Sequence, residues 1–225
     1  MNKNIEELDK KLNLNMKNKE LLKTALTHRS MTTANNERLE FLGDAVIELL
    51  VSKYLFFRFK NEKEGILTTY RSSMVQTKTL SKIASDMGIG EYLQLAKGEA
   101  DSGGRERAKI LEDTFEALIG AIYLDKGLEY TEQFLYTHLY DVLNDIIENK
   151  SYISNKSYLQ ERLQSEHKPI PRYKIVKEEG PAHNRIFTVQ VYINKDPMET
   201  GEGKSKQEAE DEAARKVIEK LYGKN

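Results

Sequence analysis

The stretch NERLEFLGDAVIELL at residues 36–50 decides the fold of this chain, together with the stretch ILEDTFEALIGAIYL at residues 110–124. Both stretches are strongly apolar at helical spacing, and each carries acids three or four residues apart. A carboxylate in apolar surroundings is costly, and four that converged would need a cation between them. The two stretches therefore predict two buried helices and a metal-dependent enzyme.

The first stretch predicts a helix with one acidic side. Asn36 precedes the apolar pattern and is a suitable N-cap. At about 100° per residue, Glu37, Glu40 and Asp44 fall within roughly 60° of one another, so their carboxylates project together. Gly43 costs a helix interior about 1 kcal/mol, which indicates that something approaches the backbone closely at this point.

The second stretch places Asp113 and Glu116 three residues apart, on one face of a helix whose other side chains supply core contacts. Ligation by oxygen alone selects hard ions such as Mg²⁺ or Mn²⁺, and two such ions can clamp the attacking and leaving oxygens of phosphodiester hydrolysis. The alternative is that these acids are ordinary exposed charges on amphipathic helices. Gly43 argues against that alternative.

Composition indicates a globular protein: 39% of the 225 residues are apolar and 32% are charged. The absence of cysteine excludes disulfides and zinc–thiolate sites. No apolar stretch is long enough to cross a membrane and the N-terminus lacks the apolar region of a signal peptide, so we expect a cytoplasmic protein. The net charge of −1 by itself argues against a general nucleic-acid binder.

The chain divides into two parts of different pattern. Residues 5–147 are helical in pattern nearly throughout and contain no proline, whereas all four prolines follow residue 168. With the polar stretch 148–156 between them, this shift predicts two domains, residues 1–150 and residues 154–223. The second part has the pattern helix, three strands, helix. The expected segments are 157–166, 172–178, 186–193, 198–203 and 204–221.

Several motifs in order resemble bacterial ribonuclease III over nearly the whole chain. These motifs are THRS at 27–30, NERLEFLGDAVIEL at 36–49, EGILT at 64–68, GGRERAKIL at 103–111 and LEDTFEALIGAIYLDKG at 111–127. The resemblance implies an all-α N-terminal endonuclease domain, followed by an α-β-β-β-α double-stranded RNA-binding domain.

The resemblance also implies roles for six acids. Those assigned to the catalytic, metal-binding cluster are Glu40, Asp44, Asp113 and Glu116. The expected metal is Mg²⁺, with Mn²⁺ able to substitute. Glu37 and Glu64 match further acidic positions that line the cleft.

The chain departs from the family pattern beside the cluster. Lys109 stands where a small residue is common, and Glu112 replaces a frequent alanine. Because the two are three residues apart, we expect them to pair on an exposed face of the helix.

The family's RNA contacts match three places in the second domain. They are Gln160, Glu161 and Gln164 on its first helix, Pro181 and His183 in a loop, and Lys204, Ser205, Lys206 and Gln207 at the start of its last helix. A helix N-terminus with two lysines suits phosphate, because the dipole and both ammonium groups attract it. Recognition would read mostly A-form shape, over about 16 base pairs.

The resemblance implies a homodimeric endoribonuclease, paired through its catalytic domain, that hydrolyses double-stranded RNA with Mg²⁺. Products with 5′-phosphate and 3′-hydroxyl ends, and a role in processing ribosomal RNA precursors and structured messenger RNAs, would follow. One alternative is a non-catalytic double-stranded RNA-binding protein, although a pure binder gains nothing from four acids beside phosphates. Another is a metal-dependent phosphatase or nuclease with a different substrate, which the RNA-binding pattern disfavours.

Overall fold

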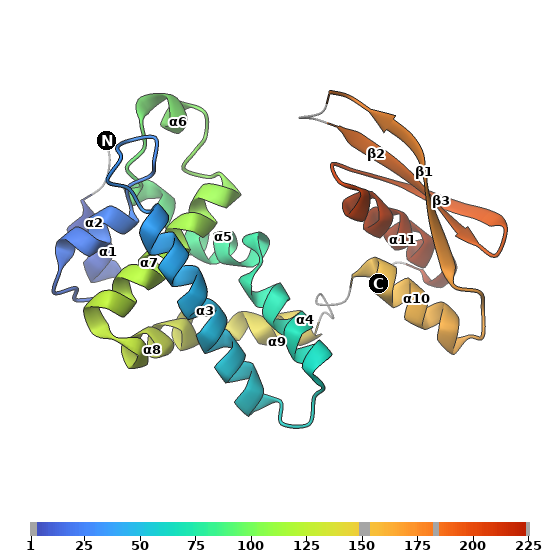
Figure 1. Ribbon diagram of the computed structural model, residues 1–225, viewed down its shortest axis with the longest axis horizontal. Helices are drawn as coiled ribbons and strands as arrows, with labels where there is room; N and C mark the ends of the chain where they lie inside the picture. Colours follow the sequence, from blue (N-terminus) through green and yellow to red (C-terminus); the bar gives the residue numbers. More distant parts are fainter. Residues whose placement is uncertain (1–3, 149–153, 182–184, 224–225) are drawn as a thin grey trace. The chain divides into compact units, whose positions relative to one another are not determined.

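The computed structural model describes residues 4–148, 154–181 and 185–223. The chain divides into two compact units, residues 1–152 and residues 153–225, here called the N-terminal and C-terminal units. Figure 1 shows the first as an assembly of helices and the second as a sheet with two helices. None of the described helices combines the length and the apolar content that crossing a bilayer requires.

The N-terminal unit is helical, as the sequence predicts. Its elements are α1 (Ile5–Lys11), α2 (Lys19–Ala25), α3 (Glu37–Arg58), α4 (Glu64–Val75), α5 (Thr77–Asp86), the 3₁₀ helix η1 (Ile89–Tyr92), α6 (Lys97–Asp101), α7 (Ala108–Lys126), α8 (Leu128–His138) and α9 (Asp141–Glu148). The apolar helix α7 lies at the centre of this unit (Figure 1), with Phe115, Leu118 and Ile122 fully buried. It packs against α2, α3, α5 and α8.

Helices α3 and α7 cross at two glycines. A Cβ atom on Gly43 would lie 1.7 Å from the carbonyl oxygen of Glu116, and one on Gly120 would lie 2.3 Å from the carbonyl oxygen of Leu39. Because neither position has room for a side chain, the two backbones approach closely. The expectation of a close approach at Gly43 is therefore met, and the element that approaches is the second acidic helix.

The start of α3 differs from the expectation in one detail. Asn36 precedes the helix, but its side chain makes no capping hydrogen bond and is buried. The side chain of the neighbouring Asn35 makes this bond instead, because its Oδ1 accepts a hydrogen bond from the backbone N–H of Glu37 at 3.0 Å. Asn36 is therefore the N-cap residue, as expected, but Asn35 supplies the side-chain hydrogen bond.

The C-terminal unit is an antiparallel sheet in the order β1-β2-β3, with two helices packed on it. Its elements are α10 (Asn155–Ser165), β1 (Pro171–Glu179), β2 (Ile186–Ile193), β3 (Asp196–Gly203) and α11 (Lys206–Tyr222). The core between sheet and helices holds Leu159, Leu163, Val191, Ala213 and Val217. This confirms the α-β-β-β-α order, although α11 begins at Lys206 and not at residue 204.

Candidate functional site

Three of the four acids assigned to the cluster converge where α3 and α7 cross. Glu40 comes from α3, and Asp113 and Glu116 come from α7. One carboxylate oxygen from each lies within 4.8 Å of the others. Glu116 is buried, while Glu40 and Asp113 are half-buried. The crossing thus joins two acidic pairs that are far apart in sequence.

Burial and mutual repulsion favour the neutral, protonated forms of the acids in this cluster. Burial raises the pKa of Glu116 to about 8, with further contributions from the charges of Asp44 and Glu112. Burial, followed by the charge of Asp113, also raises the pKa of Glu40. A bound divalent cation would offset both effects. An all-carboxylate set of donors fits Mg²⁺ or Mn²⁺, which are hard ions.

Asp44 lies outside this group of three. Its side chain is exposed on α3, one turn beyond Glu40, and its charge acts on Glu116 across the helix crossing. The structure therefore places Asp44 beside the cluster, at a more solvent-exposed position than the other acids.

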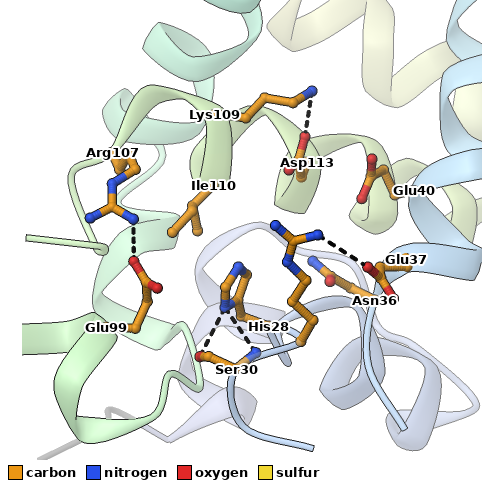
Figure 2. A pocket seen from close by; sticks show the side chains of 11 residues that line it. His28, Ser30, Asn36, Glu37, Glu40, Glu99, Arg107, Lys109, Ile110 and Asp113 are labelled. Carbon is orange, nitrogen blue, oxygen red and sulfur yellow. Dashed lines mark hydrogen bonds and ion pairs between the residues drawn. The ribbon is translucent and has the colours of Figure 1, made fainter. Parts of the chain in front are cut away.

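An open pocket of about 570 Å³ adjoins the cluster (Figure 2). The residues that line it are His28, Arg29, Ser30, Asn36, Glu37, Glu40, Glu99, Arg107, Lys109, Ile110 and Asp113. Glu37 is at the pocket, as expected for a cleft-lining acid, and its Oε1 lies 3.6 Å from Nη1 of Arg29. The motifs THRS and GGRERAKIL contain Arg29, Arg107 and Lys109, the basic side chains of this pocket, but their spacing alone did not show that the two motifs meet.

Glu64 is not brought to this pocket. It is the first residue of α4, and its Oε1 accepts a hydrogen bond from the hydroxyl of Thr68 at 2.8 Å. It lines a separate hollow of about 250 Å³ together with Phe56 and Arg71. Within one chain, Glu64 therefore does not join the acidic cluster.

The Lys109–Glu112 pair forms, but not on an exposed face. Lys109 Nζ lies 3.1 Å from Glu112 Oε2 and 2.7 Å from Asp113 Oδ1. The side chain of Glu112 is only 8% exposed, because it lies on a side of α7 that the fold covers. The expectation of a surface pair was wrong: the pair belongs to the acidic cluster.

The expected RNA contacts on α10 share its outer face. Gln160, Glu161 and Gln164 are exposed, whereas Leu159 and Leu163 are buried against the sheet. Pro181 is exposed directly after β1. His183, the other expected loop contact, lies outside the described residues.

The start of α11 presents two lysines. Ser205 caps the helix by accepting from the N–H of Glu208 at 3.1 Å, and the Glu208 carboxylate accepts from the N–H of Lys204 at 2.7 Å. These contacts occupy two backbone amide groups at the start of the helix, those of Lys204 and Glu208. In the described residues, no carboxylate lies within ion-pair distance of Lys204 or Lys206, so their ammonium groups remain available to an anion.

Comparison with known proteins agrees with both units. The family model described as ribonuclease-III-like matches residues 18–143, and the double-stranded RNA binding motif matches residues 156–221. A protein named Ribonuclease 3 from Clostridium botulinum (strain Eklund 17B / Type B) is 42% identical over 220 residues, which cover 96% of this chain and 95% of the relative. The chain belongs to the ribonuclease III family.

Other members of the ribonuclease III family show the same agreement. Ribonuclease 3 of Syntrophomonas wolfei is 45% identical over 205 residues, which cover 89% of this chain and 88% of the relative. Among solved structures, the nuclease domain of the Campylobacter jejuni ribonuclease III is 42% identical, with a TM-score of 0.59. That match covers 60% of this chain and 96% of the Campylobacter chain, whose nuclease domain has a region involved in dimer formation.

Proposed function

We propose that this protein is an endoribonuclease that hydrolyses phosphodiester bonds in double-stranded RNA with Mg²⁺. The observation that carries the proposal is the convergence of Glu40, Asp113 and Glu116 within 4.8 Å, in a chain that also carries a double-stranded RNA-binding motif. An acidic centre repels phosphate unless a cation occupies it, so a pure RNA binder has no use for it.

The acidic cluster and the C-terminal helices have different roles in the proposed reaction. Glu40, Asp113 and Glu116 would hold the ion, and Asp44 adds negative charge at the exposed side of the cluster. When bound, a divalent ion activates water and neutralises charge on the phosphate. Because burial raises the pKa of Glu116 to about 8, its carboxyl group would carry a proton near neutral pH in the absence of a cation and would release that proton to serve as a ligand. The exposed side chains of α10 and α11 would hold the duplex by its grooves and phosphates.

An exposed apolar stripe on α3 supports a homodimer. Phe41, Leu49 and Phe56 are 81%, 56% and 65% exposed, and their spacing places them along one side of the helix. A stripe of this kind marks a protein interface. A second copy of this chain is the proposed occupant, and Glu64 borders the stripe through the hollow it shares with Phe56. The catalytic contribution expected of Glu64 would then arise in the assembled dimer.

The finer expectations follow from the proposed chemistry. Attack of water on phosphorus with loss of the 3′ oxygen leaves 5′-phosphate and 3′-hydroxyl ends. Ribosomal RNA precursors and structured messenger RNAs contain the duplexes that such an enzyme needs, which places its work in the cytoplasm.

The test is incubation of the full chain with a labelled RNA duplex of about 30 base pairs, well above the roughly 16 that one RNA-binding domain spans. Mg²⁺ and chelator are compared, with the matching single strand and a DNA duplex as controls. We expect Mg²⁺-dependent cutting of the RNA duplex alone, and product ends that accept ligation without prior phosphorylation. Tight binding without cutting would favour the non-catalytic alternative instead.

A further inference from the structure

Lys109 contacts two carboxylates with a single ammonium group. Its Nζ lies 2.7 Å from Asp113 Oδ1 and 3.1 Å from Glu112 Oε2, and all three residues belong to one turn at the start of α7. Figure 2 shows Lys109 reaching over Asp113 at the rim of the pocket. The lysine side chain is 64% exposed, so its charged end can move while its stem stays on the helix.

Glu112 needs an explanation because it is a buried acid without a place in the proposed reaction. Its residue is 6% exposed, and in the described part of the chain Lys109 is the cation within ion-pair distance of it. A buried ion pair is weak support for stability, since desolvation of the two charges offsets their attraction. The charges of Glu112 and Lys109 both act on Glu40 and Glu116, so the pair is electrically part of the cluster.

We propose that Lys109 is a tethered counter-ion of the metal centre, which competes with a divalent cation for Asp113 and which Glu112 retains when the cation binds. The proposal rests on the metal site put forward above. An ammonium group has three donors and can serve both carboxylates at once. When an ion takes Asp113, Lys109 keeps Glu112 as its partner without leaving the helix surface. The pair therefore sets the affinity of the site for metal.

This arrangement gives the two residues opposite effects. Without Lys109, none of the described residues places another cation within ion-pair distance of Asp113 and the cluster gains net negative charge, so metal should bind more tightly. Without the charge of Glu112, Lys109 has Asp113 as its remaining partner and the cluster loses negative charge, so metal should bind more weakly. Simple damage to the fold would weaken metal binding in both variants.

The test is calorimetric titration of Mn²⁺ alone into the full chain without RNA. We expect Lys109→Met to tighten binding about tenfold, which corresponds to 1.4 kcal/mol. Glu112→Gln should weaken binding by about the same factor. The Mn²⁺ affinity of Lys109→Arg should stay near that of the unmodified protein, because arginine keeps the positive charge. In a double-mutant cycle, Glu112→Gln should weaken binding less when Lys109 is already Met, because part of its effect acts through the lysine.

Matched controls come from exposed pairs with the same spacing elsewhere. Lys82→Met removes the lysine of an i,i+4 pair on α5, and Glu20→Gln removes the acid of an i,i+3 pair on α2. Neither should change Mn²⁺ affinity. Unchanged or weaker binding by Lys109→Met would overturn the inference and leave the metal site in place. Absence of Mn²⁺ binding by the unmodified chain would overturn both.

Discussion

At the scale of single residues, Glu116 is where burial and repulsion act together. Its carboxylate is buried between two packed helices and faces the charges of Asp44 and Glu112. Such a group is costly to the fold and useful only when a cation is present. A substitution of Glu116 should therefore affect cleavage, stability and RNA binding differently.

Glu116→Gln should lower the rate of duplex cleavage by at least two orders of magnitude while RNA affinity stays within about threefold. The amide keeps the size of the side chain but has neither the charge nor the ligand strength that a hard ion needs. Single-turnover cleavage and a gel-shift titration in chelator measure the two effects. Full cleavage activity in this variant would contradict the assignment of Glu116 to the metal centre.

The same substitution should change how stability depends on pH. In chelator, the folded-state pKa of Glu116, about 8, lies above its ordinary value of 4.5. Stability from this group is therefore present below pH 4.5 and is lost as the pH rises through about 8. Relative to the unmodified chain, Glu116→Gln should gain on the order of 2 kcal/mol between pH 5 and pH 8. Urea unfolding measures this difference, and saturating Mg²⁺ should reverse it.

Residue spacing predicted that Asp113 and Glu116 share a face of one helix and that Glu40 lies on the acidic side of another, because acids three or four apart share a helix face whatever surrounds them. The resemblance, not the spacing, implied that the two faces meet. Spacing also did not predict that Glu112 is buried. Glu112 looked like a surface partner of Lys109 because spacing identifies which side chains meet, not which side of the helix is covered. Asn36 is the N-cap of α3 as expected, but position alone did not show that Asn35 would supply the side-chain hydrogen bond.

At the scale of helices, the crossing of α3 and α7 should tolerate no side chain. Gly43→Ala would place its Cβ 1.7 Å from the carbonyl oxygen of Glu116, so the helices must separate. We expect a loss of about 3 kcal/mol in the free energy of unfolding, together with weaker metal binding. Gly65→Ala on α4 is the matched control, because nothing lies within 4 Å of that added Cβ and alanine favours helix. Equal stability of the two variants would exclude the close crossing.

The start of α11 should act through charge. Replacing Lys204 and Lys206 with alanine should weaken binding to all RNA duplexes alike and reduce the slope of log affinity against log salt by about two. Lys216→Ala with Lys220→Ala is the matched pair, because those lysines already contact Thr200 and Glu199. A salt slope that both pairs reduce equally would mean that α11 does not meet phosphate at its N-terminus.

Periodicity predicted a helical N-terminal unit, its two acidic helices and the five elements of the C-terminal unit, because apolar spacing reflects burial on one face. Periodicity alone did not identify α7 as the helix that packs against α3 at Gly43. Gly43 indicated a close approach, but Gly120 reads as one more small residue in an apolar run, and only the fold shows that the two glycines meet. The helix α11 begins at Lys206 and not at residue 204 because the Ser205 hydroxyl caps it by accepting from the N–H of Glu208, which a simple apolar count does not detect.

At the scale of the whole molecule, we expect the N-terminal unit to carry catalysis and the C-terminal unit to supply most of the affinity for duplex RNA. A chain ending at residue 152 retains the whole acidic cluster and lacks the RNA-binding unit. We expect it to cleave duplex RNA at low salt and to lose most activity near 0.15 M salt, where phosphate contacts are screened. Cleavage rates across a salt series give the answer. Loss of activity at every salt concentration, in a chain that still folds, would mean that the C-terminal unit does more than bind.

The crossing of α3 and α7 also has a consequence for the timing of synthesis. Glu40 and Asp113 are 73 residues apart in the chain (113 minus 40). At about 5–20 residues per second, the ribosome makes α7 about 4–15 s after the acids of α3. Until then the growing chain holds only Glu40 of the three converging acids, with no partner helix at Gly43. A nascent chain that ends before α7 therefore lacks the proposed catalytic centre and should not cut RNA.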